Sequence, residues 1–414
     1  MGLACAYELL KQGHNVEVFE ADDRVGGMTA HFDFNGLSIE RYYHFICKPD
    51  QPMFDVLKEL GISDKLKWHK TRMGYFYNGQ LYDWGNPWAL LKFTPLSLVD
   101  RLRYGVHMFT CTKMKNGDSI DKVEASTWIK KWIGQKAYDI LWNKLFLLKF
   151  HKFTGNLSAS WIWARIRRVG QSRKSIFQEE MGYLDGGSIT LLDAYEIAIK
   201  KSGGKIHLSH SINKVMVESG KVIGVECEKE VLNFDKVIST IPLPFVPSMI
   251  PDLPPKVIQS YQSVQNIGVV CVLLKLKKPV TRNFWLNIND EQLDVPGLIE
   301  ISNLRPFDCH IAYIPFYLPR DNKKFKHSDG VFSEEARTIV QTVNPNISDA
   351  DILDIHVSRY GYAQPICPPG FKDSLPPIQS KIDGLYIADT SYYYPEDRSI
   401  SESVDLGKRL AGNI

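Results

Sequence analysis

Apolar positions in the first twenty residues follow a helical period and then a strand period. Those of the helical part recur every three or four residues: Leu3, Ala6, Tyr7 and Leu10. This spacing predicts a short amphipathic helix over residues 1–13, which Gly13 ends. The β-type run that follows contains Val16, Val18 and Phe19 and predicts a strand ending at Glu20.

A helix, a glycine, a strand and an acidic residue, in this order, form the second half of a Rossmann unit. In such a unit the amino end of the helix holds a pyrophosphate, and the acidic side chain accepts hydrogen bonds from ribose hydroxyls. Gly2 takes the place of the last glycine of G-x-G-x-x-G, and Glu20 lies 18 residues beyond it. We therefore expect the first strand and two further glycines upstream of Met1.

Later hydrophobic runs predict more strands and helices. Short β-type runs between glycine and serine turns fill residues 203–239 and predict a β-meander, and residues 264–276 have the character of a buried strand. In residues 182–198 a Gly-Gly turn opens an amphipathic helix. Near the end, a strand at 384–388 precedes a helix that begins at about Ser399.

Length and charge narrow the class of protein. A chain of 414 residues predicts two domains, and 44% hydrophobic and 23% charged residues are ordinary globular values. Fifty basic against 47 acidic side chains leave a net charge of +3, which argues against a nucleic-acid partner. The 12% aromatic content suits a protein that encloses a flat ring system, or simply one with an aromatic-rich core.

The spacing of the cysteines and the hydropathy of the chain indicate the cellular compartment of the protein. The seven cysteines show neither a C-x-x-C pair nor metal-ligand spacing, which predicts reduced thiols, no metal site and a cytoplasmic location. The start of the chain lacks the pattern of a signal peptide, and no apolar run reaches the ~18 residues of a transmembrane helix. We therefore expect no transmembrane segment.

The segment after Glu20 carries the most specific motif. It places Arg24, Gly26 and Gly27 in an R-x-G-G pattern directly after the predicted strand. An arginine can pair with phosphate oxygens, and paired glycines let the backbone approach a diphosphate closely. With this ordered set the sequence resembles the flavin-containing amine oxidoreductase superfamily. The stretch 395–398, Pro-Glu-Asp-Arg, resembles its protoporphyrinogen-oxidase-like branch.

The resemblance implies an FAD cofactor and an α/β fold. The expected architecture is a Rossmann-like two-dinucleotide-fold domain with a discontinuous α+β substrate domain that contains a mixed sheet and helices. The FAD-binding domain would comprise residues 1–45, 176–255 and 351–414. The substrate domain would comprise residues 46–175, mostly helical, and 256–350, mostly sheet.

The resemblance also assigns residues that would contact FAD. These are Gly2, Glu20, Ala21, Arg24, Gly26, Gly27, Met28, Ile212, Asp389, Asp397, Arg398, Ser399 and Ile400. Ile212 would pack against the adenine, although a role as strand core explains it equally well. The family's A-G-D motif is replaced by Ala-Asp-Thr at 388–390. Either Asp389 or Asp397 could therefore be the residue that binds the ribityl chain. The helix after Ser399 would stabilise negative charge on reduced flavin.

Aromatic and basic residues crowd residues 128–168. They are Trp128, Lys130, Lys131, Trp132, Tyr138, Trp142, Lys144, Phe146, Lys149, Phe150, Lys152, Trp161, Trp163, Arg165, Arg167 and Arg168. Aromatics at helical spacing are most often core, which is the favoured interpretation. The alternative is a surface that meets a membrane interface or receives a sugar-linked, lipid-linked or phosphate-bearing small-molecule substrate.

No residue is assigned to catalysis, and the candidates are His44, Tyr362 and Gln364. Arg359 and Tyr360 precede the last FAD strand and could also face the flavin ring. Each of these side chains is equally suited to a structural role. Amine oxidases place near flavin N5 a lysine whose counterpart here is Cys271, and this departure counts against ordinary amine oxidation.

Three functions fit these observations. The first is an FAD-dependent oxidoreductase that removes a hydride from a small organic substrate. The second is a redox-neutral flavoenzyme of the UDP-galactopyranose-mutase kind, acting on a nucleotide sugar. The third is a degenerate family member without enzymatic activity.

Overall fold

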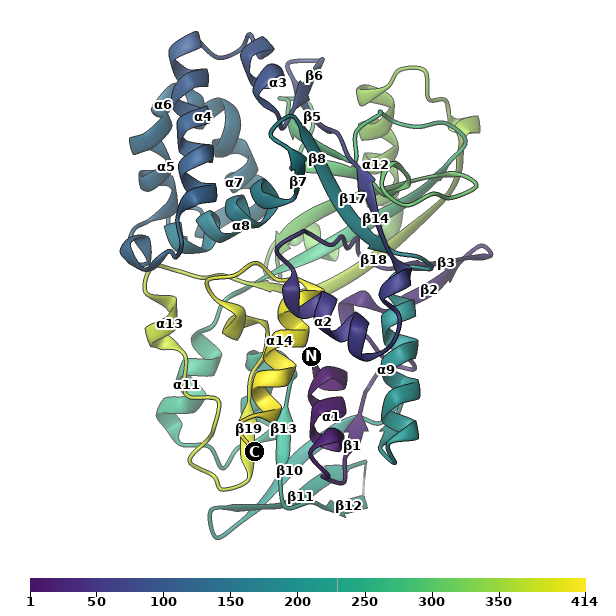
Figure 1. Ribbon diagram of the computed structural model, residues 1–414, viewed down its shortest axis with the longest axis vertical. Helices are drawn as coiled ribbons and strands as arrows, with labels where there is room; N and C mark the ends of the chain where they lie inside the picture. The colour runs from purple at the N-terminus through teal and green to yellow at the C-terminus, as the bar shows by residue number, and fades with distance from the viewer. Residues whose placement is uncertain (229) are drawn as a thin grey trace.

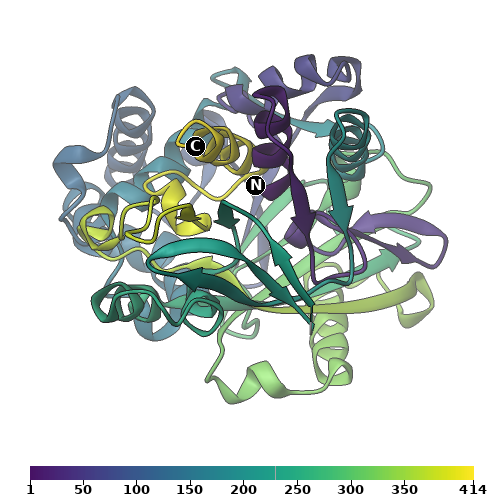
Figure 2. The same cartoon turned by 90° about the horizontal axis from the view of Figure 1, so that it is seen from below.

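The computed structural model describes residues 1–228 and 230–414. Helix α1 (Gly2–Lys11) and strand β1 (Glu17–Phe19) form where the sequence predicts them. Helix α14 (Ile400–Ala411) packs directly against α1, as Figures 1 and 2 show from two directions. Gly407 permits this approach, because a Cβ at that position would lie only 2.8 Å from the Cβ of Ala4. The two helices are thereby held with their amino ends near each other.

Two short parallel pairs of strands lie next to these helices. β1 pairs with β9 (Lys205–His207), and β13 (Val237–Ser239) pairs with β19 (Leu385–Ile387). The predicted meander is the antiparallel sheet of β10 (Ile212–Glu218), β11 (Lys221–Cys227) and β12 (Glu230–Asn233). Helix α9 (Ile189–Lys201) follows the predicted Gly-Gly turn.

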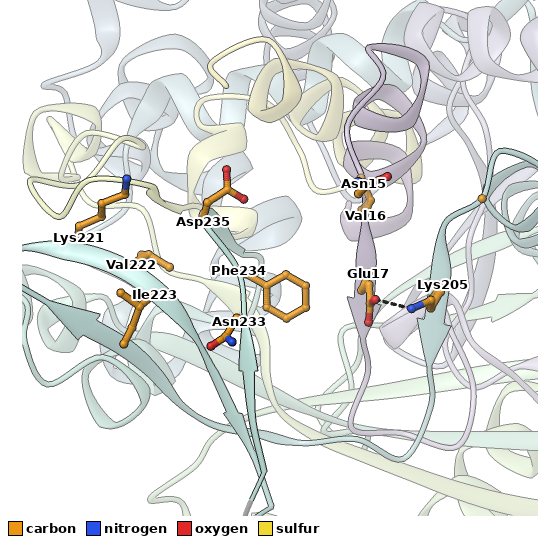
Figure 3. Close-up of a pocket in the computed structure, with 11 residues that line it drawn as sticks. Asn15, Val16, Glu17, Lys205, Lys221, Val222, Ile223, Asn233, Phe234 and Asp235 are labelled. Atoms are coloured by element: carbon orange, nitrogen blue, oxygen red, sulfur yellow. Dashed lines mark hydrogen bonds and ion pairs between the residues drawn. The ribbon is translucent and has the colours of Figure 1, made fainter.

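An opening of about 790 Å³ separates the two parallel pairs (Figure 3). Glu17 and Lys205 lie on one side of it, and Val222 and Phe234 lie on the other. Within the described residues β1 pairs only with β9, and its other edge faces this opening. The strand expected upstream of Met1 would belong here in a Rossmann unit, and that strand stays a prediction.

A seven-stranded mixed sheet forms the other half of the molecule. Its order is β18 (Ile352–Pro365), β14 (Asn266–Leu276), β17 (His310–Pro319), β16 (Gly297–Glu300), β15 (Trp285–Asn289), β5 (Met73–Tyr77) and β6 (Gln80–Trp84). β14 alternates between two buried faces. Val270 and Val272 share a core with helix α12 (Asp329–Val343), whereas Val269 and Cys271 face the opposite side.

Helices α3 to α8 form a group beside the sheet (Figure 1). They are α3 (Pro87–Lys92), α4 (Leu98–Lys113), α5 (Ala125–Ile133), α6 (Gln135–Tyr138), α7 (Lys144–Phe150) and α8 (Ala159–Gln171), with a π-helical turn, Asp139–Asn143, between α6 and α7. Trp128, Trp161 and Trp163 are 7%, 3% and 1% exposed. For these three tryptophans the core interpretation is therefore right.

Shorter elements connect these groups. They are β2 (His31–Phe34), β3 (Leu37–Glu40), α2 (Gln51–Glu59), β4 (Leu66–Lys70), β7 (Arg173–Ser175), β8 (Gln178–Leu184), α10 (Val246–Met249), α11 (Pro255–Ser263) and α13 (Phe371–Ser374). Residues 46–175 supply β5 and β6 to the mixed sheet in addition to their helices. The predicted domain boundaries stay predictions. In the part of the chain that is described, no helix is both long and apolar enough to cross a bilayer.

Candidate functional site

A cavity of about 640 Å³ lies between the two halves of the molecule. The start of α1, the end of β1, the glycine turn after it and the start of α14 form one part of its wall. Helices α7 and α8 and strands β14, β15, β17 and β18 form much of the rest. The fold therefore brings most of the predicted cofactor residues and the predicted substrate region to one space.

The glycine turn has the backbone geometry that only glycine adopts readily. Gly26 and Gly27 have φ angles of +111° and +55°, and both line the cavity together with Met28. A Cβ on Gly26 would lie 2.5 Å from a methyl group of Leu192, whereas a Cβ on Gly27 would meet no atom within 4 Å. Gly27 therefore leaves its backbone open to a ligand, and Gly2 contributes the amino end of α1 to the same wall.

Glu20 lies at the end of β1 and lines the cavity, as predicted from its spacing. One of its carboxylate oxygens accepts a hydrogen bond from the backbone N–H of Asp22 at 3.0 Å. The backbone carbonyl of Glu20 accepts from the N–H of His210, which ties the end of β1 to the chain after β9. This fixes the position of an acidic side chain beside the glycine turn.

Arg24 does not line the cavity. Its guanidinium donates to the His31 carbonyl at 2.8 Å and to the Asp23 carboxylate at 2.5 Å, so its hydrogen bonds stabilise the local turn. Ala21 is exposed and Ile212 begins β10, and neither side chain belongs to the cavity wall. Their predicted contacts with a cofactor stay predictions.

The C-terminal part of the wall contains both candidates for binding the ribityl chain, Asp389 and Asp397. Asp389 is buried and accepts from the backbone N–H groups of Ser391, at 2.8 Å, and Leu243, at 2.9 Å. Asp397 lies 3.0 Å from Nε of Arg165. Burial raises the pKa of Asp397, but the nearby guanidinium groups of Arg165 and Arg168 outweigh it and hold this pKa below its usual value. Asp389 is thus held by backbone donors and Asp397 by arginines.

The amino end of α14 reaches the cavity through Arg398, Ser399 and Ile400. The Ser399 hydroxyl caps the helix by accepting from the N–H of Glu402 at 3.1 Å. The first N–H groups of a helix lack partners within the helix, and its dipole favours negative charge there. This end of α14 is therefore suited to an electron-rich ring edge or an anion.

The sheet presents alternate residues to the cavity. Cys271 on β14 and Tyr360 and Tyr362 on β18 lie on the wall, and burial raises the pKa of the Cys271 thiol, so that it stays neutral. A β-bulge between Tyr360 and Gln364 of β18 breaks the alternation after Tyr362, so that Ala363 lines the wall. Gln364 is consequently buried outside the wall, where its amide has no hydrogen-bond partner among the described residues.

His44 lies on the cavity wall beside a buried charged network. Burial lowers its pKa to about 4, although the Glu40 carboxylate nearby acts in the opposite direction. The ring is therefore neutral at pH 7, and its Nδ1 atom has no partner within residues 1–228 and 230–414. A neutral imidazole with a free nitrogen can accept or donate a hydrogen bond to a ligand.

The helical part of the wall comes from residues 128–168, for which the sequence favoured a core role and left a substrate-binding surface as the alternative. On α7 and the π-helical turn before it, Trp142, Leu145, Phe146 and Lys149 line the cavity, and on α8 Ile162, Arg165, Ile166 and Val169 do so. Both sets follow the spacing i, i+3, i+4, i+7 that places residues on one helix face. This shared spacing of polar and aromatic residues is the signal in the sequence that could have located the wall. No cluster suited to a metal ion occurs in the described ranges.

Comparison with known proteins now assigns the chain to a family. It matches the flavin-containing amine oxidoreductase family over residues 2–395. The chain belongs to this family. The resemblance carried by Glu20 and the R-x-G-G motif is thus confirmed, and so is the α/β fold class with its mixed sheet.

The individual proteins that the chain is similar to differ from it widely in sequence. Protoporphyrinogen oxidase 2, chloroplastic/mitochondrial, of Arabidopsis thaliana is 28% identical over 145 residues, which are 34% of this chain and 28% of that protein. An oxidoreductase from Methanosarcina mazei is 18% identical, with a TM-score of 0.73 over 100% of this chain and 97% of that chain. Putrescine oxidase bound to putrescine is 17% identical, with a TM-score of 0.72 over 99% and 96%. These two structures share the fold.

Proposed function

We propose that this protein is an FAD-dependent oxidoreductase that removes a hydride from a small organic substrate. The observation that carries the proposal is the single cavity that joins the glycine turn and Glu20 to the aromatic wall of α7 and α8. Such a space can hold a dinucleotide at one end and a substrate against its reactive ring at the other.

The residues present fit this cofactor. The open backbone at Gly27 and the amino end of α1 would bind the diphosphate, and Glu20 would accept hydrogen bonds from the ribose. The start of α14 would stabilise negative charge on the pyrimidine part of the flavin. When bound, FAD supplies the hydride-accepting chemistry at its N5 atom.

The remaining wall would orient the substrate and exclude water. Cys271 lies on the cavity face of β14, where amine oxidases are expected to carry a lysine, and a neutral thiol cannot replace an ammonium group. This supports a substrate other than a simple amine. His44 is placed to hold a hydrogen bond to the substrate or the flavin in its neutral form.

Anaerobic spectroscopy tests the proposal. Full-length protein loaded with FAD is mixed with candidate substrates without oxygen, and the flavin absorbance is recorded. Loss of the oxidised-flavin bands on substrate addition is the expected result. Turnover only with pre-reduced flavin and without net electron transfer would establish the redox-neutral chemistry of a mutase instead. A protein that binds no FAD would contradict both.

We also propose that α4 contacts a membrane surface. Its exposed face carries five large apolar side chains: Leu98, Val99, Leu102, Val106 and Phe109. Exposed basic residues flank them at Lys92, Arg103, Lys113 and Lys115, whereas Asp100 is the only acidic residue between 92 and 115. An apolar stripe bordered by positive charge is suited to anionic lipid headgroups. The cytoplasmic location stays a prediction from the cysteine pattern.

A further inference from the structure

The substrate side of the cavity contains hydrogen-bond donors that the protein itself leaves unused. The side-chain nitrogen of Lys149 makes no ion pair or hydrogen bond with any described residue, and only more distant charges act on it. It lies over the ring of Tyr317, 5.0 Å from the ring centre. The indole Nε1 of Trp142, two helical turns earlier, is buried without a partner in the described ranges. Both side chains face the cavity.

Arg165 adds a third donor from the neighbouring helix. Its guanidinium stacks on Trp161 at 4.3 Å, and Nε lies 3.0 Å from Asp397 in an ion pair. The Nε–H is nevertheless without a hydrogen-bond acceptor in the part of the chain described, because it does not point at that carboxylate. Arg398 donates to the backbone carbonyl of Ala363, which leaves its positive charge without a carboxylate partner of its own.

The charges on this side of the cavity do not cancel. Arg168 is neutralised by Asp50, to which it donates two hydrogen bonds at 2.9 and 2.7 Å. Asp397 is the carboxylate that pairs with Arg165 and lies near Lys149 and Arg398, whereas Asp389 on the same wall is held by backbone N–H groups. Burial, with Arg165 and Arg398 nearby, holds the pKa of Lys149 well below its usual value. A negatively charged ligand would relieve this repulsion.

The cluster is separate from the part of the wall suited to the diphosphate. Lys149 packs on Tyr317 of β17, at the mixed sheet, and Arg165 lies on α8. The glycine turn instead packs against Leu192 of α9, and Gly2 lies against Thr240 after β13. Lys149 and Arg165 therefore belong to the substrate side, where Trp142 and Phe146 provide apolar contact, and Arg398 lies near Lys149 from the start of α14.

We propose that Lys149, Arg165 and Arg398 form an anion subsite that binds a carboxylate or phosphate group of the substrate, with the Trp142 indole as a further donor. The adjoining part of the substrate would pack against the aromatic wall. This inference rests on the proposed function, because the bound anion is taken to be part of the molecule that the flavin oxidises. It specifies an acidic substrate, in contrast to the cationic amines of amine oxidases.

Calorimetric titration tests the subsite. FAD-loaded full-length protein is titrated with inorganic phosphate and, separately, with benzoate, which combines a carboxylate with an aromatic ring. We expect at least one of them to bind, and the stronger ligand shows which acidic group the subsite prefers. Lys149→Met and Arg398→Leu should each weaken binding about tenfold, the effect of losing one charge-assisted hydrogen bond.

Lys152→Met is the matched control. Lys152 lies three residues beyond Lys149, just after the end of α7, and it is exposed and pairs with Asp321 at 2.5 Å outside the cavity. Its loss should therefore leave anion binding unchanged. Thermal melts establish that each variant is folded. Equal affinities for Lys149→Met and Lys152→Met, or no binding of either anion to the wild type, would overturn the subsite.

Flavin content distinguishes failure of this inference from failure of the proposed function. If the wild type and the variants all retain flavin but bind anions with equal affinity, the subsite is rejected and the proposed function is not. A wild type without flavin would reject the proposed function, and the same titration of that protein would still decide whether Lys149 and Arg398 bind an anion.

Discussion

The guanidinium of Arg305 donates to both carboxylate oxygens of Glu40, with each N···O distance 3.2 Å. Both side chains are buried, and Glu40 also accepts from the backbone N–H of Ser188 at 2.8 Å. This pair joins the hairpin β2–β3 and the start of α9 to the chain after the mixed sheet's strand β16. The ion pair therefore fixes the position of the cofactor side of the cavity relative to the substrate side.

The pair makes stability depend on pH. Burial raises the pKa of Glu40, but the hydrogen bond with His31 and the charge of Arg305 outweigh it and lower this pKa well below its usual value. A carboxylate whose folded pKa is depressed contributes stability that is present above its unfolded pKa of about 4.3 and lost as pH falls below it. Glu40→Gln should lower stability at pH 7 by about 3 kcal/mol, because Arg305 is left unpaired. Its melting temperature should also fall less steeply than that of the wild type between pH 5 and the acid limit of folding. Parallel curves for the two proteins would contradict this account.

Gly187 lies next to the Glu40–Arg305 ion pair, at a position where backbone conformation and space both favour glycine. It has a φ of +91°, and a Cβ there would lie 2.1 Å from Nη1 of Arg305 and 2.8 Å from Oε1 of Glu40. Gly187→Ala should therefore destabilise the protein by about 3 kcal/mol or more, from backbone strain and displacement of the ion pair. Gly203→Ala is the control, since Gly203 has a φ of +84° but no atom within 4 Å of its Cβ position, and should cost only about 1 kcal/mol. Differential scanning calorimetry measures both, and similar losses would show that crowding at Gly187 is unimportant.

Glu20 and Arg24 should differ in their effect on cofactor binding. Glu20→Ala removes an acceptor on the cavity wall and should weaken FAD binding about tenfold or more. Arg24→Ala removes hydrogen bonds to His31 and Asp23 outside the wall and should change FAD affinity little. Equilibrium titration by flavin fluorescence measures both constants. A larger loss of FAD affinity for Arg24→Ala than for Glu20→Ala would show that Arg24 binds the diphosphate. It would contradict the position of Arg24 outside the cavity wall.

Local patterns predicted the cofactor side of the molecule well. α1, β1, the meander, α9 and α14 depend on short-range signals such as Gly13, the Gly-Gly turn before α9 and the Ser399 cap. Such signals act within a few residues of one another and can be recognised in the sequence. The resemblance to the family then supplied their arrangement in space, which periodicity alone does not.

The substrate side was harder to predict because its chemistry depends on tertiary packing. Lys149 and Arg165 lie on helices whose aromatic neighbours Trp161 and Trp163 are core, and only the orientation of α7 and α8 separates cavity residues from core residues. The position of Gln364 depends on a β-bulge that has no clear local signal. Arg24 fits a phosphate-binding motif, yet local hydrogen bonds occupy it.

Membrane contact through α4 can be tested by vesicle sedimentation. The protein should sediment with phosphatidylglycerol vesicles more than with phosphatidylcholine vesicles, because the stripe is bordered by basic residues. Phe109→Asp, at a side chain 64% exposed, should lower the affinity about tenfold by removing apolar burial. Leu353→Asp, at a residue 47% exposed on β18, is the control. No sedimentation of the wild type with either kind of vesicle would contradict membrane contact. A wild-type dimer that Phe109→Asp converts to a monomer would show that this face binds a second copy of the protein.

Whether the cavity holds FAD is decided by the cofactor content of the full-length protein. Chromatography of the small molecules released by denaturation should identify FAD, at one molecule per chain, and Gly27→Val should lower this content sharply because its side chain would project into the open cradle. A wild-type protein that carries no flavin and takes up none when FAD is added would contradict the account.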